Sequence, residues 1–335
     1  MTSDIGEPTP RAEAQQPQRP RRRRGGRGEI SMVPEMTPTS YYGRAVLKQP
    51  VWTPEIGVYF FVGGLTGAST LLAAAARSEG NDALADRALF TALAGVTVSP
   101  LLLIKDLGRP ERFYNMLRVF KVTSPMSLGT WLLNGAGVST GVAAGCRVLG
   151  ILPRIQRLAE LSAALLGPGV STYTAVLVSN TAVPVWHEAR YELPFVFAGS
   201  SLASAGAMGI LLTPPRHAAT ARTLAVAGVV GELVATQVME RRLGDAGEPY
   251  HSGRSARFAR LARGLNAGGA AAVALGGRRR RALSALGAAA ILAGSMCERW
   301  AVFTAGPESA ADPRFTVGPQ RERLREQRRR THALD

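Results

Sequence analysis

Long apolar segments alternate with short polar ones over most of the 335-residue chain. Each apolar segment is rich in Ala, Gly, Leu and Val, and its length is close to the roughly 20 helical residues that cross the hydrocarbon core of a bilayer. The pattern therefore predicts an all-α fold, a polytopic membrane helical bundle with about eight transmembrane helices. The predicted spans are residues 56–76, 88–104, 126–149, 158–183, 193–213, 223–239, 259–275 and 283–305.

Three spans carry features that refine this prediction. The first contains small residues at 63–68 (Gly-Gly-Leu-Thr-Gly-Ala), which would let neighbouring helices approach closely. The fourth contains Gly-Pro-Gly at 167–169, which predicts a kink or a break. The seventh is the least apolar, because Arg260 and Arg263 shorten its hydrophobic part.

The polar ends and the charge define the domain organisation. Residues 1–40 are rich in Pro, Gln and Arg and are predicted to be a disordered basic tail. The transmembrane domain is expected at 41–306, and a second basic tail at 307–335.

The net charge of +16 does not indicate nucleic-acid binding, because the basic residues lie in tails and in loops between apolar segments. Most of the 40 Lys and Arg residues fall on the side that both ends share. This predicts a protein of the cell membrane, in contact with lipid, with both termini in the cytoplasm.

The loop at 105–125 mixes charges of both signs with aromatic and Met side chains. Arginine together with aromatic residues and Met is typical of a docking surface for another protein. The alternative is an amphipathic segment that lies on lipid. A second loop at 186–192 falls on the same predicted side. The predicted docking residues are Asp106, Arg109, Arg112, Phe113 and Arg190.

The fourth span and the loop after it carry a series of polar residues. Tyr173, Asn180 and His187 are seven residues apart, close to two helical turns, and would share one face. They lead to the Trp-His-Glu-Ala-Arg motif at 186–190, which includes Glu188. A quinone head group needs hydrogen-bond donors and a supply of protons, and His and Glu can exchange protons. The alternative is that these residues form interhelical hydrogen bonds and an interfacial belt.

Glu232 lies in the middle of the sixth span. A carboxylate at the bilayer centre costs roughly 2.5–3.5 kcal/mol. Glu232 is therefore expected to face the helix bundle and to be paired, protonated or part of a proton path. The adjacent Glu298 and Arg299, near the end of the last span, could instead pair with each other locally, and this structural interpretation is the favoured one for them.

Some cofactors are not expected. None of the four histidines falls within a predicted span, so a haem held by two histidines between membrane helices is not expected. The two cysteines form no Cys-x-x-Cys pair, so this chain should bind neither an iron–sulfur cluster nor another metal.

Several motifs together resemble a known family. They are Tyr-Gly-Arg at 42–44, Pro-Val-Trp at 50–52, Tyr-Phe-Phe-Val-Gly-Gly at 59–64, Asp-Leu-Gly-Arg-Pro-Glu-Arg-Phe at 106–113 and Ser-Pro-Met-Ser at 124–127. Over residues 41–325 the chain resembles the NrfD / polysulfide-reductase membrane-subunit family, and its later motifs are similar to the actinobacterial branch.

The resemblance implies a haem-free, eight-helix membrane anchor that binds menaquinone or ubiquinone. It also implies two partners, a four-cluster ferredoxin-like iron–sulfur subunit and a molybdopterin catalytic subunit such as a formate or polysulfide oxidoreductase. On this reading Tyr173, Asn180 and Tyr59 contact the quinone, His187 or Glu188 exchanges protons, and Glu232 lies on a buried proton path. Two other functions stay open: a purely structural anchor and a proton-coupled transporter.

Overall fold

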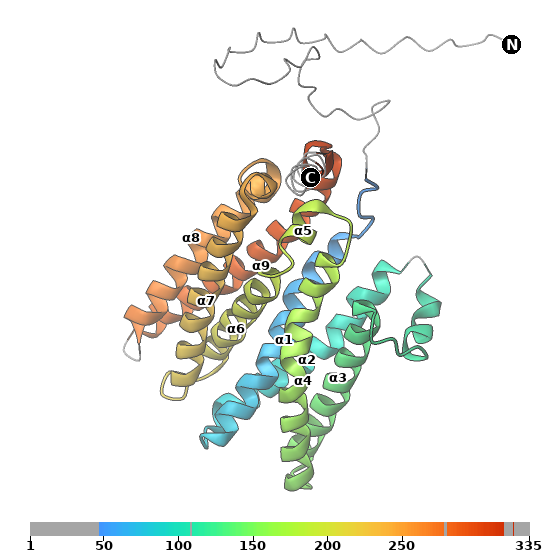
Figure 1. Cartoon of the computed structure of the whole chain (residues 1–335). Helices are drawn as coiled ribbons and strands as arrows, with labels where there is room; N and C mark the ends of the chain where they lie inside the picture. The colour runs from blue at the N-terminus through green and yellow to red at the C-terminus, as the bar shows by residue number, and fades with distance from the viewer. Residues whose placement is uncertain (1–46, 108, 278–279, 318–323, 325–335) are drawn as a thin grey trace, which may run out of the picture. The chain divides into compact units, whose positions relative to one another are not determined.

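The computed structural model describes residues 47–107, 109–277, 280–317 and 324. The described residues form eleven helices and no strand (Figure 1). The helices are α1 Pro54–Ser78, α2 Asp82–Asp106, η2 Pro110–Leu117, α3 Pro125–Leu149, α4 Pro153–Ser179, α5 Pro184–Glu188, α6 Leu193–Leu212, α7 Ala219–Leu243, η3 Gly244–Tyr250, α8 Gly253–Gly276 and α9 Arg281–Ala311. The tail predicted at 1–40 lies outside the described residues, as does most of the one at 307–335.

Every predicted span corresponds to a long helix, so the all-α bundle is confirmed. Six helical stretches in the described residues are long and apolar enough to cross a membrane. They comprise α1, α2, α4, α6, α9 and a stretch that joins α7 to η3. The other two long helices, α3 and α8, have 25 and 24 residues and are less apolar. Each packs along a more apolar neighbour, α3 on α4 and α8 on α9.

Local sequence signals set several helix ends. Pro occupies the first turn of α1, α3 and α4, where its missing N–H leaves no intrahelical bond unmade. Ser124 caps α3 by accepting a hydrogen bond from Ser127 N. Gly150 ends α3 with a φ of 65°, which glycine adopts without strain. Of the kink or break predicted at 167–169, the break is wrong, because α4 continues through Pro168.

The long helices form two groups, α1–α4 and α6–α9, which meet along α1 and α6 (Figure 1). Glycine allows the closest approach in the first group. A Cβ atom added to Gly67 would lie 2.2 Å from the carbonyl oxygen of Gly167, and one added to Gly167 would lie 2.4 Å from that of Gly67. Gly167, which belongs to the segment predicted to kink or break α4, lets α1 and α4 touch backbone to backbone.

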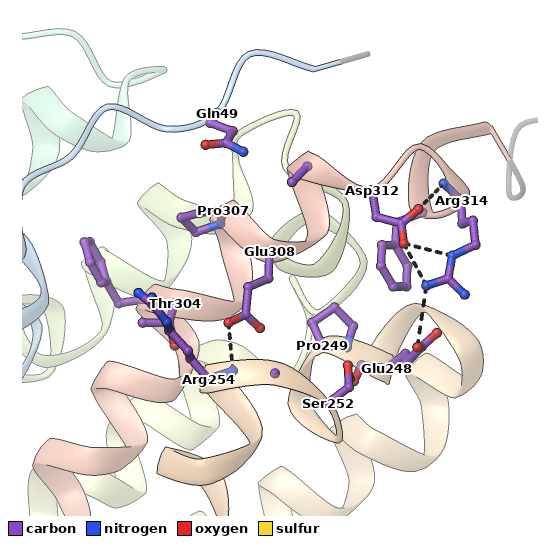
Figure 2. A pocket seen from close by; sticks show the side chains of 14 residues that line it. Gln49, Glu248, Pro249, Ser252, Arg254, Thr304, Pro307, Glu308, Asp312 and Arg314 are labelled. Atoms are coloured by element: carbon purple, nitrogen blue, oxygen red, sulfur yellow. Dashed lines mark hydrogen bonds and ion pairs between the residues drawn. The ribbon is translucent and has the colours of Figure 1, made fainter. Parts of the chain in front are cut away.

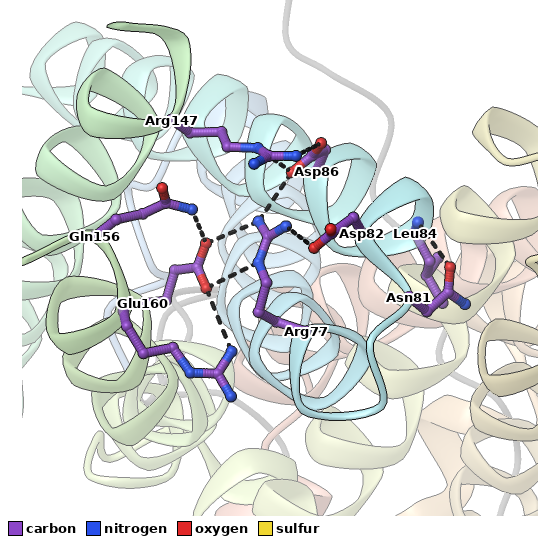
Figure 3. Close-up of polar contacts among 9 residues, drawn as sticks. Arg77, Asn81, Asp82, Leu84, Asp86, Arg147, Gln156 and Glu160 are labelled. Atoms are coloured by element: carbon purple, nitrogen blue, oxygen red, sulfur yellow. Dashed lines mark hydrogen bonds and ion pairs between the residues drawn. The ribbon is translucent and has the colours of Figure 1, made fainter. Parts of the chain in front are cut away.

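A group of charged side chains, here called the Arg77 cluster, joins the four helices of the first group at one end (Figure 3). Arg77 of α1 donates hydrogen bonds to Asp82 and Asp86 of α2 at 2.7 and 2.9 Å and to Glu160 of α4 at 2.9 Å. Arg147 of α3 donates to the second oxygen of Asp86 at 2.7 Å. The Glu160 side chain is only 1% exposed, so its charge depends on these partners.

The opposite end of α1 holds the two loops that were predicted to share a side. Asp106, at the end of α2, accepts hydrogen bonds from Thr53 N at 2.9 Å and Thr53 Oγ1 at 2.7 Å. Next to Thr53, the ring of Trp52 stacks on that of Trp186, with centroids 5.4 Å apart. These contacts place the start of the 105–125 loop and α5 at the same end of the bundle.

Candidate functional site

A pair of tyrosines joins α1 to α4 near this end. The hydroxyl groups of Tyr59 and Tyr173 are hydrogen-bonded to each other, and their ring centroids are 6.3 Å apart. Tyr59 is 1% exposed and Tyr173 is 9% exposed. A phenol can donate one hydrogen bond, and the mutual bond uses only one of the two hydroxyl hydrogens. One buried O–H therefore remains able to donate to a further acceptor.

Small and apolar residues surround the tyrosine pair. A Cβ atom on Gly129 of α3 would lie 2.0 Å from Cε2 of Tyr173, so only glycine leaves room for the ring there. Leu133, one turn along α3, belongs to the same buried apolar cluster as both tyrosines. It also lines a cavity of about 450 Å³ between α2, α3 and η2. The cavity is largely apolar and shares Leu133 with the cluster that contains the tyrosines, although neither tyrosine lines it. Its other lining residues include Leu103, Ile104, Met116, Thr130 and Asn134.

The predicted polar face of the fourth span is wrong, although Tyr173 is buried. Helix α4 ends at Ser179, and Asn180 is its exposed C-cap residue. Pro184 starts the separate short helix α5, which carries His187. His187 is exposed, with Nδ1 3.2 Å from the carbonyl oxygen of Ser179. The seven-residue spacing had assumed a helix that the structure interrupts after Asn180, so His187 does not continue the face of Tyr173. The N–H of Asn180 still bonds to the carbonyl oxygen of Val176.

Charged residues after α5 bind to one another and to α7. Arg242 donates to the side chain of Glu192 at 2.7 Å and also to the backbone oxygen of Glu188. Arg190 lies 4.0 Å from the Glu188 carboxylate, and its guanidinium carbon is 4.5 Å from the ring centroid of Tyr191. Glu188 is therefore held in a charged surface network at the end of the bundle that also carries Asp106.

The predicted docking loop presents its side chains outward. No residue of η2 is buried, and Arg109 and Arg112 are exposed. Phe113 is 43% exposed and contributes its remaining surface to the apolar cavity beside α3. Asp106 differs from these residues, because both its hydrogen bonds go to Thr53 at the start of α1. It fixes the loop to the bundle.

Glu232 faces the bundle interior, as its position in the sequence predicts, and is 1% exposed. Its Oε1 accepts a hydrogen bond from Asn266 Nδ2 at 2.7 Å. Sequence reasoning missed Asn266, because a single amide in an arginine-rich segment carries no signal. It also placed Arg299 too near a helix end. Helix α9 continues to Ala311, so Arg299 is buried within it and is 1% exposed.

Arg299 does not pair locally with Glu298 in the described residues. Its Nη2 donates to the carbonyl oxygen of Phe197 at 2.6 Å and to Ser201 Oγ at 2.8 Å, both on α6. Its guanidinium carbon lies 3.7 Å from the ring centroid of Phe197. The expectation of a local pair is wrong because adjacent residues on a helix point in different directions.

A pocket of about 660 Å³ lies where α8 begins and α9 ends (Figure 2). Glu308 accepts a hydrogen bond from Arg254 N at 3.0 Å and so caps the start of α8. Arg314 contacts Asp312 at 2.7 Å and Glu248 at 3.6 Å. The hydrogen bonds from Arg314 hold the pKa of the Asp312 carboxyl below its usual value. The acidic side chains of this pocket therefore already have partners, Glu308 at the start of α8 and Asp312 and Glu248 at Arg314.

In the part of the chain that is described, no group of three or more His, Cys, Asp or Glu residues could hold a metal ion.

The long apolar helices and their buried polar groups define a polytopic membrane protein. Residues 46–241, more than half of the chain, match the family model described as "Polysulphide reductase, NrfD", and the chain belongs to this family. Members of the family are membrane subunits of quinone-interacting oxidoreductase complexes. No curated protein matches the chain. The matched stretch contains the tyrosine pair, η2 and Glu232, whereas Asn266 and Arg299 lie beyond it.

Proposed function

We propose that the chain is the quinone-interacting membrane anchor of a molybdopterin oxidoreductase complex. In this role it passes electrons between an iron–sulfur subunit and menaquinone or ubiquinone. The observation that carries the proposal is the buried Tyr59–Tyr173 pair with one unused O–H, together with an apolar cavity that shares Leu133 with the cluster around the pair. A quinone carbonyl is a hydrogen-bond acceptor, and a buried donor left without an acceptor is unfavourable, so the two groups are complementary.

The cavity beside the pair suits the apolar part of the same molecule. Its wall is mostly Leu, Ile, Val, Phe and Met, and α3 packs more closely on α4 than on α2. A quinone that diffuses in the bilayer can reach the tyrosines between α2 and α3, with its isoprenoid tail along Leu103 and Leu133. Asn180 is assigned a contact near the opening of the site, because it is exposed at the end of α4.

The iron–sulfur subunit is proposed to dock on the end of the bundle that carries η2 and α5. The exposed aromatic and basic side chains there, among them Phe113, Arg109, Arg112 and Arg190, match the composition of a protein interface. Docking at this end brings electrons to the end of α1 nearest to Tyr59.

His187 and Glu188 lie at the same end and are assigned proton exchange with water, and Glu232 is assigned to a buried proton path. We place this end, with both termini, on the cytoplasmic side of the cell membrane, which the arginine-rich tails support.

A quinone analogue tests the proposal directly. The chain is purified together with the subunits that accompany it, and binding of a fluorescent hydroxyquinoline inhibitor is titrated. We expect saturable binding with a stoichiometry of about one, which quinone in excess displaces. Absence of displaceable binding would contradict the quinone site and favour a purely structural anchor. Proton-driven uptake of a solute by the chain alone would favour a transporter, for which the buried Glu232 is the best feature.

Gly129 gives a variant that disturbs the pair without touching its hydroxyls. In Gly129→Ala the new methyl group overlaps the Tyr173 ring, so the ring must move and the tyrosine hydrogen bond is lost. Because a shift of about 1 Å in a reacting group can cost up to about a hundredfold in rate, we expect quinone reduction to fall about tenfold or more. The control is Gly141→Ala in the same helix, where nothing lies within 4 Å of the added atom. Equal rates in the two variants would show that the position of Tyr173 is unimportant.

A further inference from the structure

Helix α8 lies at the outer edge of the second group of helices and packs on α9, α7 and η3 (Figure 1). Its charged side chains are all in its first half: Arg254, Arg257, Arg260 and Arg263. Residues 264–277 contain no charged side chain. In a membrane helix this division places the arginines at the level of the lipid headgroups and the uncharged half among the acyl chains.

The arginines of α8 wind around the helix. They are three residues apart, so each is rotated by about 60° from the one before. Arg254, Arg257 and Arg260 are exposed, whereas Arg263 is half-buried. Its Nη1 lies 3.2 Å from the carboxylate of Glu240 on α7. The row therefore leads from the outer surface of α8 to the side that faces α7.

A cavity of about 430 Å³ lies between the end of η3 and the first turns of α8. Its lining residues are Tyr250, His251, Ala256, Arg260 and Arg263. The volume is within the roughly 300–1,000 Å³ that is usual for ligand pockets. Tyr250 is 2% exposed, and its hydroxyl has no hydrogen-bond partner among the described residues. A buried hydroxyl without a partner is unfavourable, so the cavity wall contains an unused donor besides its guanidinium groups.

The charge around the cavity is positive. Arg263 is paired with Glu240, but within the described residues Arg257 and Arg260 belong to no ion pair. Arg241, which follows Glu240 at the end of α7, is exposed and has no ion pair there either. Guanidinium groups bind phosphate oxygens with charge-assisted hydrogen bonds. The ammonium group of a zwitterionic headgroup would be repelled by the same charges, so the cavity favours an anionic phosphate.

The surface next to these arginines, toward the membrane interior, is apolar. Three exposed side chains of α7 lie four residues apart and precede Arg241: Val230, Val234 and Val238. On α8, a Cβ atom added to Gly264 or Gly268 would meet nothing within 4 Å among the described residues. Both helices thus carry basic side chains at one end of an apolar surface, which matches a molecule with an anionic head and apolar tails.

We propose that η3 and the first half of α8 bind the headgroup of one anionic phospholipid, with its phosphodiester in the cavity at Arg260 and Arg263. Its acyl chains lie along Gly264 and Gly268 of α8 and the exposed valines of α7. Basic pockets between membrane helices are suited to such headgroups. Helix α8 packs closely on α9 and much less on α7, so the bound lipid supplies contacts between α7 and α8.

Lipid titration of the full-length chain tests the site. The chain is purified in detergent with the subunits that accompany it, and dioleoylphosphatidylglycerol or dioleoylphosphatidylcholine is added while native mass spectrometry counts the bound lipids. We expect one phosphatidylglycerol to bind at least tenfold more tightly than phosphatidylcholine, because only the former has a net negative headgroup. Equal affinity for the two lipids would overturn the proposal.

Two arginine variants localise this preference. Arg257 and Arg260 are exposed, so Arg257→Gln and Arg260→Gln remove charge without opening the core. We expect Arg260→Gln to weaken phosphatidylglycerol binding at least fivefold, and the double variant to remove the preference over phosphatidylcholine. The control is Arg281→Gln, an exposed arginine at the start of α9 and so at the other end of the α8–α9 pair, with affinity within twofold of wild type. Equal losses in Arg260→Gln and Arg281→Gln would show an effect of net charge alone and refute the site.

A photoreactive lipid locates the site in the wild-type chain and so remains decisive if a variant fails to assemble. Phosphatidylglycerol with a diazirine on one acyl chain is added to phosphatidylcholine nanodiscs that hold the complex, and the labelled residues are found by mass spectrometry. We expect several times more label on residues 230–241 and 253–268 than around Leu165 of α4, which is 82% exposed but has no basic cavity beside it. Equal labelling of the two regions would mean that lipid covers the bundle without preference, which contradicts the proposal.

Two competition experiments distinguish the lipid from other anions. We expect inorganic phosphate at millimolar concentration to leave the labelling of α8 unchanged. Displacement of the label by phosphate would assign the cavity to a soluble anion. We also expect the labelling to be the same with and without the accompanying subunits. Loss of label only when they are present would assign this surface to an acidic segment of a partner protein, and either result would overturn the lipid site.

Discussion

Replacing Tyr173 with phenylalanine is expected to slow quinone reduction by the assembled complex roughly ten- to a hundredfold. Removing one positioned hydrogen-bond donor from a site where negative charge develops typically costs about a hundredfold or more. The lower part of our range allows for Tyr59, whose hydroxyl remains and can donate in its place. Stopped-flow measurement of quinol formation gives the rate, and co-purification of the subunits reports assembly, which should be unchanged.

The double variant sharpens this prediction. If the two hydroxyls act as one unit, Tyr59→Phe together with Tyr173→Phe should cost little more than the more damaging single change. Tyr191→Phe is the matched control, because Tyr191 is 62% exposed and lies outside the apolar cluster of the pair. Unchanged quinone kinetics in Tyr173→Phe, or an equal loss in Tyr191→Phe, would refute the assignment.

Replacing Arg77 with alanine is expected to lower the free energy of unfolding by about 3–5 kcal/mol, the cost of leaving a buried ion without its partner. The change removes a charged partner from Glu160, Asp82 and Asp86 at once, and Glu160 is nearly fully buried. Asp86 keeps Arg147, and Arg157 stays 4.0 Å from Glu160. Gln156 remains hydrogen-bonded to Glu160 at 3.1 Å, but it carries no charge. Thermal unfolding of the chain in detergent, followed by near-ultraviolet circular dichroism, measures the effect.

Two further variants rank the contributions within the Arg77 cluster. Asp82→Asn should cost less than about 1 kcal/mol, because the Asp82 side chain is 63% exposed and water screens its interaction with Arg77. Arg87→Ala, an exposed position on the same helix, should change stability by less than about 0.5 kcal/mol. Similar losses in Arg77→Ala and Arg87→Ala would show that the cluster adds nothing beyond a surface charge.

The fold was predictable because each membrane span is a long run of apolar residues that can be recognised in the sequence alone. A run of about 20 apolar residues is read from the sequence without knowledge of its neighbours, and each predicted span became a helix. The predicted burial of Glu232 followed from the same reasoning, since a carboxylate cannot face lipid cheaply. Fold class and the inward orientation of this residue therefore needed no three-dimensional information.

The partners of each buried group could not be predicted in this way. The bond between Tyr59 and Tyr173 joins residues 114 positions apart. The bond between Glu232 and Asn266 joins two helices whose close glycine contacts are with other helices, α7 with α6 and α8 with α9. The face assigned to Tyr173, Asn180 and His187 failed for a local reason, because the helix ends at Ser179. Spacing alone cannot reveal such an end inside a continuous apolar segment.

Trp186 contacts segments that are made at very different times during synthesis of the chain. Its indole N–H donates to the carbonyl oxygen of Val302 at 2.7 Å, and its ring fills a space that only Gly306 of α9 leaves open. The same ring is the surface on which Trp52, ahead of the first helix, is stacked. A ribosome makes Trp52 and Trp186 before Val302 and Gly306, so the contacts of the Trp186 ring with α9 form only after α9 has been made. During translation this end of the bundle therefore stays unfinished until α9 has entered the membrane.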